Sequence, residues 1–202
     1  MEIIQNKMRY VKQDFSDIDL NEQSLFENHF SECSFKASEM ANLTTERCIF
    51  ENCDFSFARL NGSFHRGSCF LNCIFRSSSL FSAEFLECKC TGSTFSGADL
   101  TALELKGGDY SYTVFNDSDL SGWNLSGLKM EHAFLQNCSL KRADLRKTDL
   151  RHAVLTGSNL EQADLRDAQI EGIDFASLRL KQTKIDLAQA VLVAEAMGCI
   201  CT

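Results

Sequence analysis

The chain carries an apolar residue at almost every fifth position, in one phase that runs from Tyr10 to Ile185. A period of five fits neither the 3.6-residue turn of an α-helix nor the two-residue alternation of a flat strand. The apolar residues also form columns at a spacing of twenty, one mostly Phe and the next mostly Leu. Stacking of like side chains from coil to coil explains such columns. The pattern therefore predicts a four-sided solenoid with five residues on each side.

Small residues occupy the position two before each central apolar residue, as Cys33, Cys53 and Cys73 do on one side. A narrow tube with one large side chain per side has room there only for a small partner. Nine of the 11 glycines stand two residues after a central position, where the chain turns a corner and a positive φ is favoured. Proline is absent, as expected where nearly every backbone N–H bonds to the next coil.

Two polar residues, Thr45 and His65, interrupt one apolar column in neighbouring coils. Leu43 and Phe64 stand nearby as displaced substitutes for the missing central residues. We therefore expect this side to bulge in the second and third coils. Tolerated irregularity in a long repeat is the alternative.

Three further positions depart from the pattern. Cys90 and Tyr110 share another column, and the pair Gly107–Gly108 just before Tyr110 predicts a kink or a small loop in the wall. Trp123 occupies an inward position meant for a small residue, so a distortion is expected there too.

The five-residue period stops after Ile185, and a stretch of good helix formers follows. Asp186 is placed to cap a short helix and Gly198 to end it. Its apolar residues spread too widely for one buried face, so one side is expected to close the solenoid and the rest to stay exposed. A two-fold dimer interface is predicted from these residues: Leu187, Val191, Leu192, Val193 and Met197. A lid that buries all of them is the alternative.

The pattern divides the chain into an N-terminal cap over residues 1–9, a solenoid of about nine coils over 10–185, and a dimerisation helix with its tail over 186–202. A composition of 44% hydrophobic and 24% charged residues is typical of a globular protein. No apolar stretch is long enough to span a bilayer, and the first twelve residues lack the apolar centre of a signal peptide. A cytoplasmic location without membrane contact is expected.

Seven of the 10 cysteines fall at inward positions, and none of their spacings resembles paired metal ligands. Reduced, inert thiols and no metal site are expected, although Cys69, Cys199 and Cys201 lie outside the inward pattern and are open to oxidation. The four histidines have no partnered nucleophile, and the carboxylates do not converge on a pocket. Neither enzymatic activity nor a cofactor is predicted.

The segments 143–146 (ADLR), 163–166 (ADLR) and 97–100 (GADL) resemble the A-(D/N)-L-x-x signature of the pentapeptide-repeat proteins. The likeness extends over residues 10–185, and it implies a right-handed quadrilateral parallel β-helix. The signature is a packing rule and says little about function.

A chain of about 200 residues with a short apolar C-terminal helix also resembles the topoisomerase-protecting branch of that family, whose members counter quinolones or albicidin. The unbroken phase shows no large projecting loops, which makes the mycobacterial and the albicidin-resistance members the more similar ones, and of these the albicidin-resistance type is expected. This resemblance implies a DNA-mimicking homodimer that binds DNA gyrase and shields it from poisons. It transfers no contact residue.

The formal net charge of −8 argues against direct binding of nucleic acid and favours a basic partner. Residues 1–60 carry a net charge of −5 and residues 131–202 a net charge of −1. Carboxylates near the predicted kink are the candidate contacts with the basic DNA-binding saddle of gyrase: Asp99, Glu104, Asp109, Asp117 and Asp119. A scaffold that binds some other protein, acidic only for solubility, is the alternative.

Overall fold

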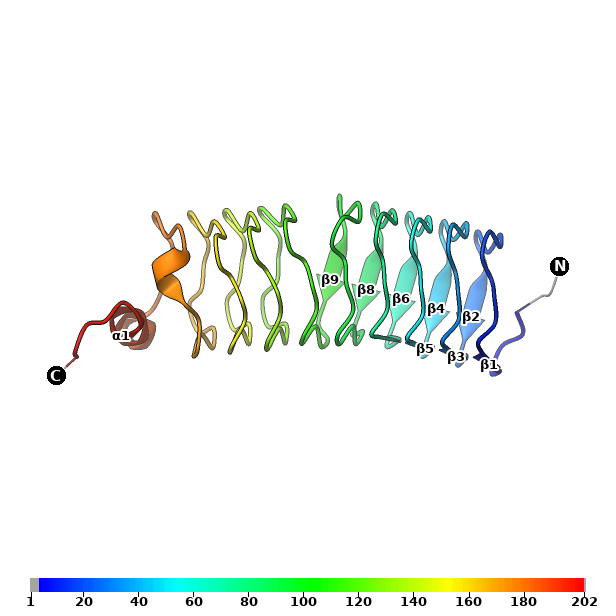
Figure 1. Cartoon of the computed structure of the whole chain (residues 1–202), viewed down its shortest axis with the longest axis horizontal. Helices are drawn as coiled ribbons and strands as arrows, with labels where there is room; N and C mark the ends of the chain where they lie inside the picture. The colour runs from blue at the N-terminus through cyan, green and yellow to red at the C-terminus, as the bar shows by residue number, and fades with distance from the viewer. Residues whose placement is uncertain (1–3, 202) are drawn as a thin grey trace. The chain divides into compact units, whose positions relative to one another are not determined.

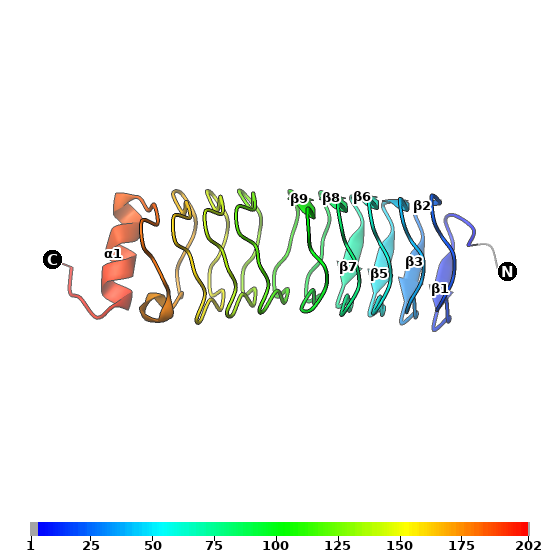
Figure 2. The same cartoon turned by 90° about the horizontal axis from the view of Figure 1, so that it is seen from above.

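The computed structural model describes residues 4–201. It consists of two compact units, one that ends at Asp109 and one that begins at Tyr110. In both units the chain winds as a parallel β-solenoid, and a single short α-helix follows the last coil of the second (Figures 1 and 2). The solenoid predicted from the five-residue period is confirmed.

Short parallel strands line two sides of the first unit. The first sheet has the order β1-β3-β5-β7 and contains β1 (Arg9–Val11), β3 (His29–Ser31), β5 (Ile49–Glu51) and β7 (Cys69–Leu71). The second has the order β2-β4-β6-β8-β9 and contains β2 (Ser24–Phe26), β4 (Thr44–Glu46), β6 (Phe64–Arg66), β8 (Glu84–Leu86) and β9 (Glu104–Lys106).

All strand pairs join residues twenty apart, as Tyr10 and Phe30 do. Single parallel bridges with the same offset line the other two sides, for example between Asp14 and Ser34 and between Asp19 and Glu39. In the second unit such bridges line all four sides, and Val114, Phe134 and Val154 form one of these columns. Four columns at a spacing of twenty confirm the predicted four-sided coil.

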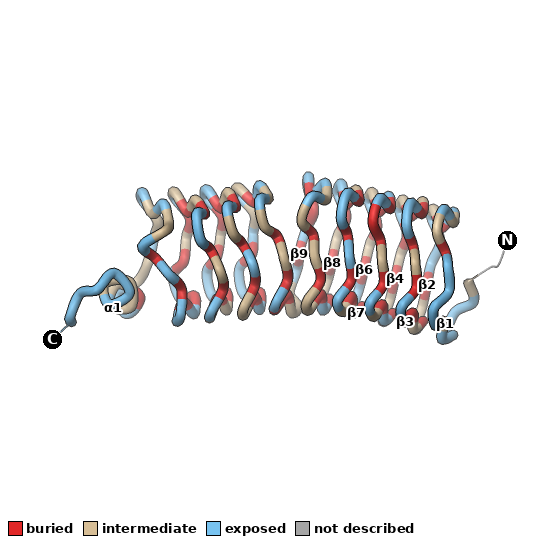
Figure 3. Tube along the Cα trace, in the orientation of Figure 1, coloured by how far each residue is buried: buried red, intermediate tan, exposed pale blue. Residues whose placement is uncertain are grey.

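Central residues form the core of each coil, and Figure 3 shows buried and exposed positions alternating along the tube. In the first unit Phe30 stacks on Phe50 with ring centroids 4.9 Å apart, and Phe35 stacks on Phe55 at 5.0 Å. Offset aromatic pairs contribute about 0.5–1.5 kcal/mol beyond the burial of their area. The Phe columns of the sequence are therefore continuous ring stacks inside the coils.

Buried thiols and hydroxyls close gaps in the backbone hydrogen bonding. The Cys53 thiol donates to the Phe30 carbonyl at 3.5 Å, and the Ser93 hydroxyl donates to the Phe70 carbonyl at 2.7 Å. The same contact joins Cys138 to the carbonyl of Phe115 at 3.2 Å. Burial raises the pKa of Cys138 to about 11, so its thiol stays protonated and able to donate.

Corner residues take a positive φ whether or not they are glycine, as Lys12 (53°) and Phe57 (63°) do. An L-residue in this left-handed region loses about 1–2 kcal/mol. Glycine at a corner can also serve a second purpose, because the Asn42 side-chain oxygen lies 2.6 Å from the place of a Cβ on Gly62. Coil geometry, rather than glycine, imposes the corner conformation.

The bulge expected at Thr45 and His65 is wrong. Strands β4 and β6 stay in register with these two residues opposite each other, and both side chains are buried. Thr45 Oγ1 lies 2.7 Å from Nδ1 of His65, and the Ser63 hydroxyl lies 3.0 Å from Nε2. Ser68 completes the group, with its hydroxyl 3.1 Å from that of Thr45. The polar atoms satisfy one another inside the coil, so the wall has no reason to bulge.

The distortion expected at Trp123 is wrong, and of the two expected substitutes only Leu43 lies inside the coil. Leu43 is buried at its small inward position, and Phe64 lies on the outer surface of β6. Trp123 is only half-buried, so its ring does not have to fit in the tube. The backbone N–H of Trp123 donates to the Leu120 carbonyl at 3.2 Å, and its backbone carbonyl accepts from the Asp144 N–H at 2.9 Å, as in neighbouring coils.

The kink or small loop expected at Gly107–Gly108 stays a prediction, but two successive residues there have a positive φ. Gly107 has the positive φ of a normal corner (68°), and Gly108 adds a second at 102°. A Cβ on Gly108 would lie 2.0 Å from the carbonyl oxygen of Cys88 in the coil before it. The nearby column residues Cys90 and Tyr110 are fully buried in their respective units. A close backbone approach thus marks the last coil of the first unit.

The predicted C-terminal helix is α1 (Leu187–Ala196), which follows the 3₁₀ turn η1 (Phe175–Ser177). Asp186 caps the helix, and it shares a capping box with Gln189. The buried Gln189 amide also donates to the carbonyls of Leu165 and Ala168, at 2.6 and 2.8 Å. Its side chain thus replaces two donors of the kind that a further coil supplies, a side-chain donor at Leu165 and a backbone N–H at Ala168.

Candidate partner-binding surfaces

The negative charge of the chain lies mainly in the first unit. That unit has 16 acidic and 10 basic residues, and the second has 12 and 10. Arginines in the second unit form ion pairs with the aspartate two positions earlier. For example, a guanidinium nitrogen of Arg166 lies 2.6 Å from a carboxylate oxygen of Asp164. This pair lowers the pKa of Asp164 to about 2. The uncompensated acidic surface therefore belongs to the coils before Asp109.

The five predicted contact carboxylates do not share one face. Asp99, Glu104 and Asp109 belong to the first unit, and Asp117 and Asp119 to the second. Within the first unit Asp99 bridges to Ser79, Glu104 to Glu84 and Asp109 to Lys89, which are three different columns. The structure thus distributes these three carboxylates around one coil instead of gathering them.

Part of this acidic set has a structural role. Asp99 accepts a hydrogen bond from the N–H of Thr101 at 3.0 Å, and Asp119 accepts one from Ser121 at the same distance. Hydrogen bonding from the side chains of Thr101 and Ser121, together with these backbone N–H groups, lowers the pKa of both carboxyls. The Asp or Asn of the repeat signature is therefore a cap for the corner that follows it.

Glu104 is partly neutralised by its surroundings. Its carboxylate lies 2.6 Å from Nζ of Lys106, which also contacts Glu84 at 3.1 Å. Hydrogen bonds to these two carboxylates raise the pKa of Lys106. The cluster keeps one net negative charge on the outer surface of β8 and β9.

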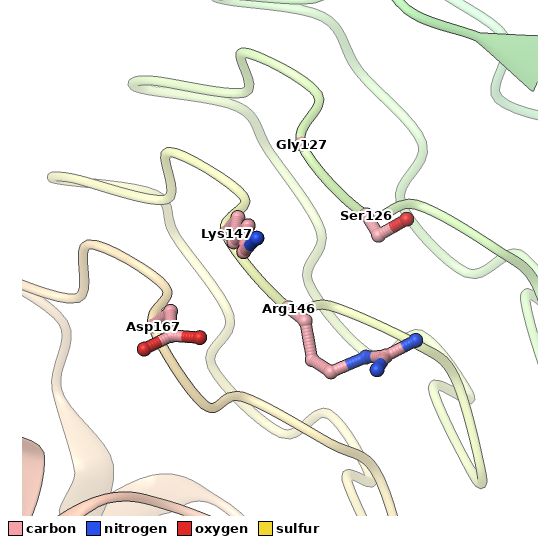
Figure 4. Close-up of a pocket in the computed structure, with 5 residues that line it drawn as sticks. All are labelled: Ser126, Gly127, Arg146, Lys147 and Asp167. Atoms are coloured by element: carbon pink, nitrogen blue, oxygen red, sulfur yellow. The ribbon is translucent and has the colours of Figure 1, made fainter.

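A depression of about 420 Å³ lies over one corner column of the second unit (Figure 4). Its lining consists of Ser126, Gly127, Arg146, Lys147 and Asp167. The Ser126 hydroxyl donates to Asn124 at 2.6 Å, and no histidine lines the depression to activate it. Over residues 4–201 no group of three or more His, Cys, Asp or Glu side chains is arranged to hold a metal ion.

Helix α1 presents much of its apolar surface to solvent. Leu187 is 89% exposed, Met197 60% and Val191 44%. Leu192 and Val193 are half-buried. The predicted exposed apolar residues are therefore present at the end of the second unit. In the part of the chain that the structure describes, no helix has the length and apolar character needed to cross a membrane.

Sequence reasoning missed two sets of exposed aromatic rings. Tyr112 stacks on His132 with centroids 4.8 Å apart, and His132 stacks on His152 at 5.0 Å. Their spacing of twenty at corner positions was the available signal. Phe57 also stands at a corner, 62% exposed, and nothing in its spacing sets it apart.

Comparisons with known proteins agree with the architecture. Residues 118–157 and 138–177 match the family "Pentapeptide repeats", with eight copies of the repeat. The pentapeptide repeat protein MfpA of Mycobacterium tuberculosis is 38% identical over 85 residues, which are 42% of this chain and 46% of the relative. The match thus spans less than half the length of that curated relative.

Two solved structures share the fold. Trypsin-treated QnrB1, a plasmid-mediated fluoroquinolone resistance protein, superposes with a TM-score of 0.84 at 20% identity, over 98% of this chain and 99% of its own. HetL, a pentapeptide repeat protein involved in heterocyst differentiation regulation in the cyanobacterium Nostoc, gives a TM-score of 0.50 at 19% identity, over 89% and 85%. The repeats between residues 118 and 177 are thus similar to the pentapeptide-repeat family, and the coil shares the fold of solved pentapeptide-repeat structures.

Proposed function

We propose that this protein binds DNA gyrase as a homodimer and protects it from topoisomerase poisons. The observation that carries the proposal is an acidic solenoid that ends in an exposed apolar helix. An acidic surface is complementary to a basic groove built for DNA, and an exposed apolar helix is suited to pair with a second copy. The fold shared with a fluoroquinolone resistance protein also supports a role in protection from such drugs.

Albicidin is the poison that we propose first, because the uninterrupted coil phase resembles the albicidin-resistance protein AlbG. Fluoroquinolones are the second, in view of QnrB1. A supercoiling assay with purified gyrase tests both: the protein is titrated against a fixed inhibitory dose of each drug. Restored supercoiling supports the proposal. No effect on either poison, or on gyrase alone, would leave the alternative, a scaffold for another protein partner.

Neutralising the five candidate carboxylates is expected to weaken protection about tenfold, because surface charges steer a partner of opposite sign. Asp99→Asn and Asp119→Asn keep the side-chain oxygen that caps the corner, so only the charge is lost. The variant is completed by Glu104→Gln, Asp109→Asn and Asp117→Asn. The measurement is the protein concentration that restores half of the supercoiling.

A matched variant neutralises five carboxylates in the first coils and separates position from total charge. It carries these changes: Asp14→Asn, Asp17→Asn, Asp19→Asn, Glu22→Gln and Glu32→Gln. Near-normal protection is expected from it. Equal loss in both variants would show that overall charge, rather than the predicted contact set, matters.

Val191→Asp is expected to convert the dimer into monomers, since a carboxylate placed in an apolar interface is buried without a partner. Light scattering should give twice the 22.7 kDa mass of one chain for the wild type and the mass of one chain for the variant. Glu195→Ala alters an exposed polar position of the same helix and should remain dimeric. A monomeric wild type, or a dimeric Val191→Asp, would refute the predicted interface.

A further inference from the structure

Phe57 is a bulky residue held in an unfavourable conformation at the surface. It turns a corner of the first unit with φ of 63°, where a large L-residue is strained. Its side chain is nevertheless 62% exposed, so burial offsets little of that strain. Neither the coil geometry nor the core explains a phenylalanine at this corner.

The aromatic corner of the second unit provides a contrast. Tyr112 also has a positive φ (59°) and is 50% exposed, but its ring stacks on His132. Phe57 makes no ring stack and no cation–π contact with any residue between 4 and 201. The strain at Tyr112 therefore has an internal compensation, and the strain at Phe57 has none.

The neighbours of Phe57 make its surroundings suitable for contact. Its N–H donates to the carbonyl of Arg76 at 3.0 Å, which places the two residues side by side in successive coils. Ile74 projects from the same side as Arg76 and is 39% exposed. The backbones of Phe57 and Arg76 are therefore adjacent, and the exposed Ile74 lies two residues before Arg76.

Arg76 differs from the other cations around this corner. Lys36 lies 3.1 Å from Asp54, and Arg59 lies 3.3 Å from Glu39. Among the residues that the structure describes, none forms an ion pair with the exposed Arg76. An unpaired cation in a unit with six more acidic than basic residues is available for a carboxylate from outside.

We propose that Phe57, Ile74 and Arg76 form a contact surface that places the Phe57 ring in an apolar pocket of the partner, with a partner carboxylate opposite Arg76. Aromatic and arginine side chains carry much of the binding energy at protein interfaces, and charge complementarity selects an acidic rim over a basic one. The inference rests on the proposed function, because the partner is gyrase. This contact is separate from any that the acidic surface makes with the DNA-binding saddle.

Phe57→Asn tests the proposal, because Asn tolerates positive φ and lacks the ring. The melting temperature is expected to rise, and affinity for purified gyrase, measured by surface plasmon resonance, to fall about tenfold or more. Arg76→Gln should weaken binding without a change in melting temperature. Ser77→Asn, in the same corner column one coil later, introduces the same residue without removing a ring and should leave the affinity for gyrase unchanged.

The outcomes separate this inference from the proposed function. If the wild type binds gyrase and Phe57→Asn binds it equally well, the contact surface is overturned and the proposed function still stands. A Phe57→Asn variant that is both less stable and weaker in binding would show a structural role and would also overturn it. A wild type that does not bind gyrase would overturn both.

Discussion

Gly108→Ala is expected to destabilise the first unit by about 3 kcal/mol or more, because the new methyl group has no space. Its Cβ would lie 2.0 Å from the Cys88 carbonyl oxygen, a backbone atom that cannot rotate away. The φ of 102° adds strain for any L-residue. Urea unfolding followed by circular dichroism measures the effect as a lower midpoint.

Gly97→Ala is the matched control. Gly97 also has a positive φ, at 75°, and no atom lies within 4 Å of the place of its Cβ. It should lose only about 1 kcal/mol, the ordinary penalty of the left-handed region. Equal midpoints for the two variants would mean that the close approach at Gly108 is not a constraint in solution.

The stability of the first unit is expected to fall as the pH drops below about 6.5, and His65 is the reason. Burial lowers the pKa of His65 to about 3, whereas an unfolded histidine titrates near 6.5. Between pH 3 and 6.5 this histidine is protonated in the unfolded chain and neutral in the folded chain. The free energy of unfolding therefore decreases by up to about 1.4 kcal/mol per pH unit, and above 6.5 this contribution is constant.

Urea titrations between pH 4.5 and 7.5 isolate this effect, because carboxylates such as Asp99 and Asp119 have pKa values below 3.8 when folded. Stability that depends on them is present above about 4 and is lost only at lower pH. His65→Phe should flatten the profile in the chosen window, and His132→Gln, at a half-buried corner, should keep it. A His65→Phe protein with the wild-type slope would contradict the assignment.

The solenoid and its sides could be predicted because they depend on residue volume alone. Phe30, Phe50 and Phe70 recur at a fixed spacing, and like side chains stack wherever coils are equal in length. The helix was equally predictable, since Asp186 and Gly198 are local signals. Polar partners could not be found this way. Thr45 contacts His65 only because the coil brings residues twenty apart together. The sequence shows two polar residues in an apolar column, and without their contact it predicts a bulge.

The candidate surfaces could likewise be predicted only in part. The exposed residues of α1 were predictable, because apolar residues on all sides of a helix cannot all be buried against one neighbour. The sequence did not reveal that Asp99 and Asp119 cap corners, nor that Asp99, Glu104 and Asp109 occupy different columns. The exposure of Phe57 could not be predicted either, because the repeat gives every corner the same spacing and does not single out one residue type there.

The side-chain closure at Gln189 has a consequence for how such chains change length during evolution. The amide satisfies two carbonyls near the end of the coils, at Leu165 and Ala168, whatever number of coils precedes them. Duplication or deletion of twenty residues would preserve every column, whereas a change of five would move each later side by one quarter of a turn. The heritable unit of length in this fold is therefore the whole coil, four pentapeptides at a time.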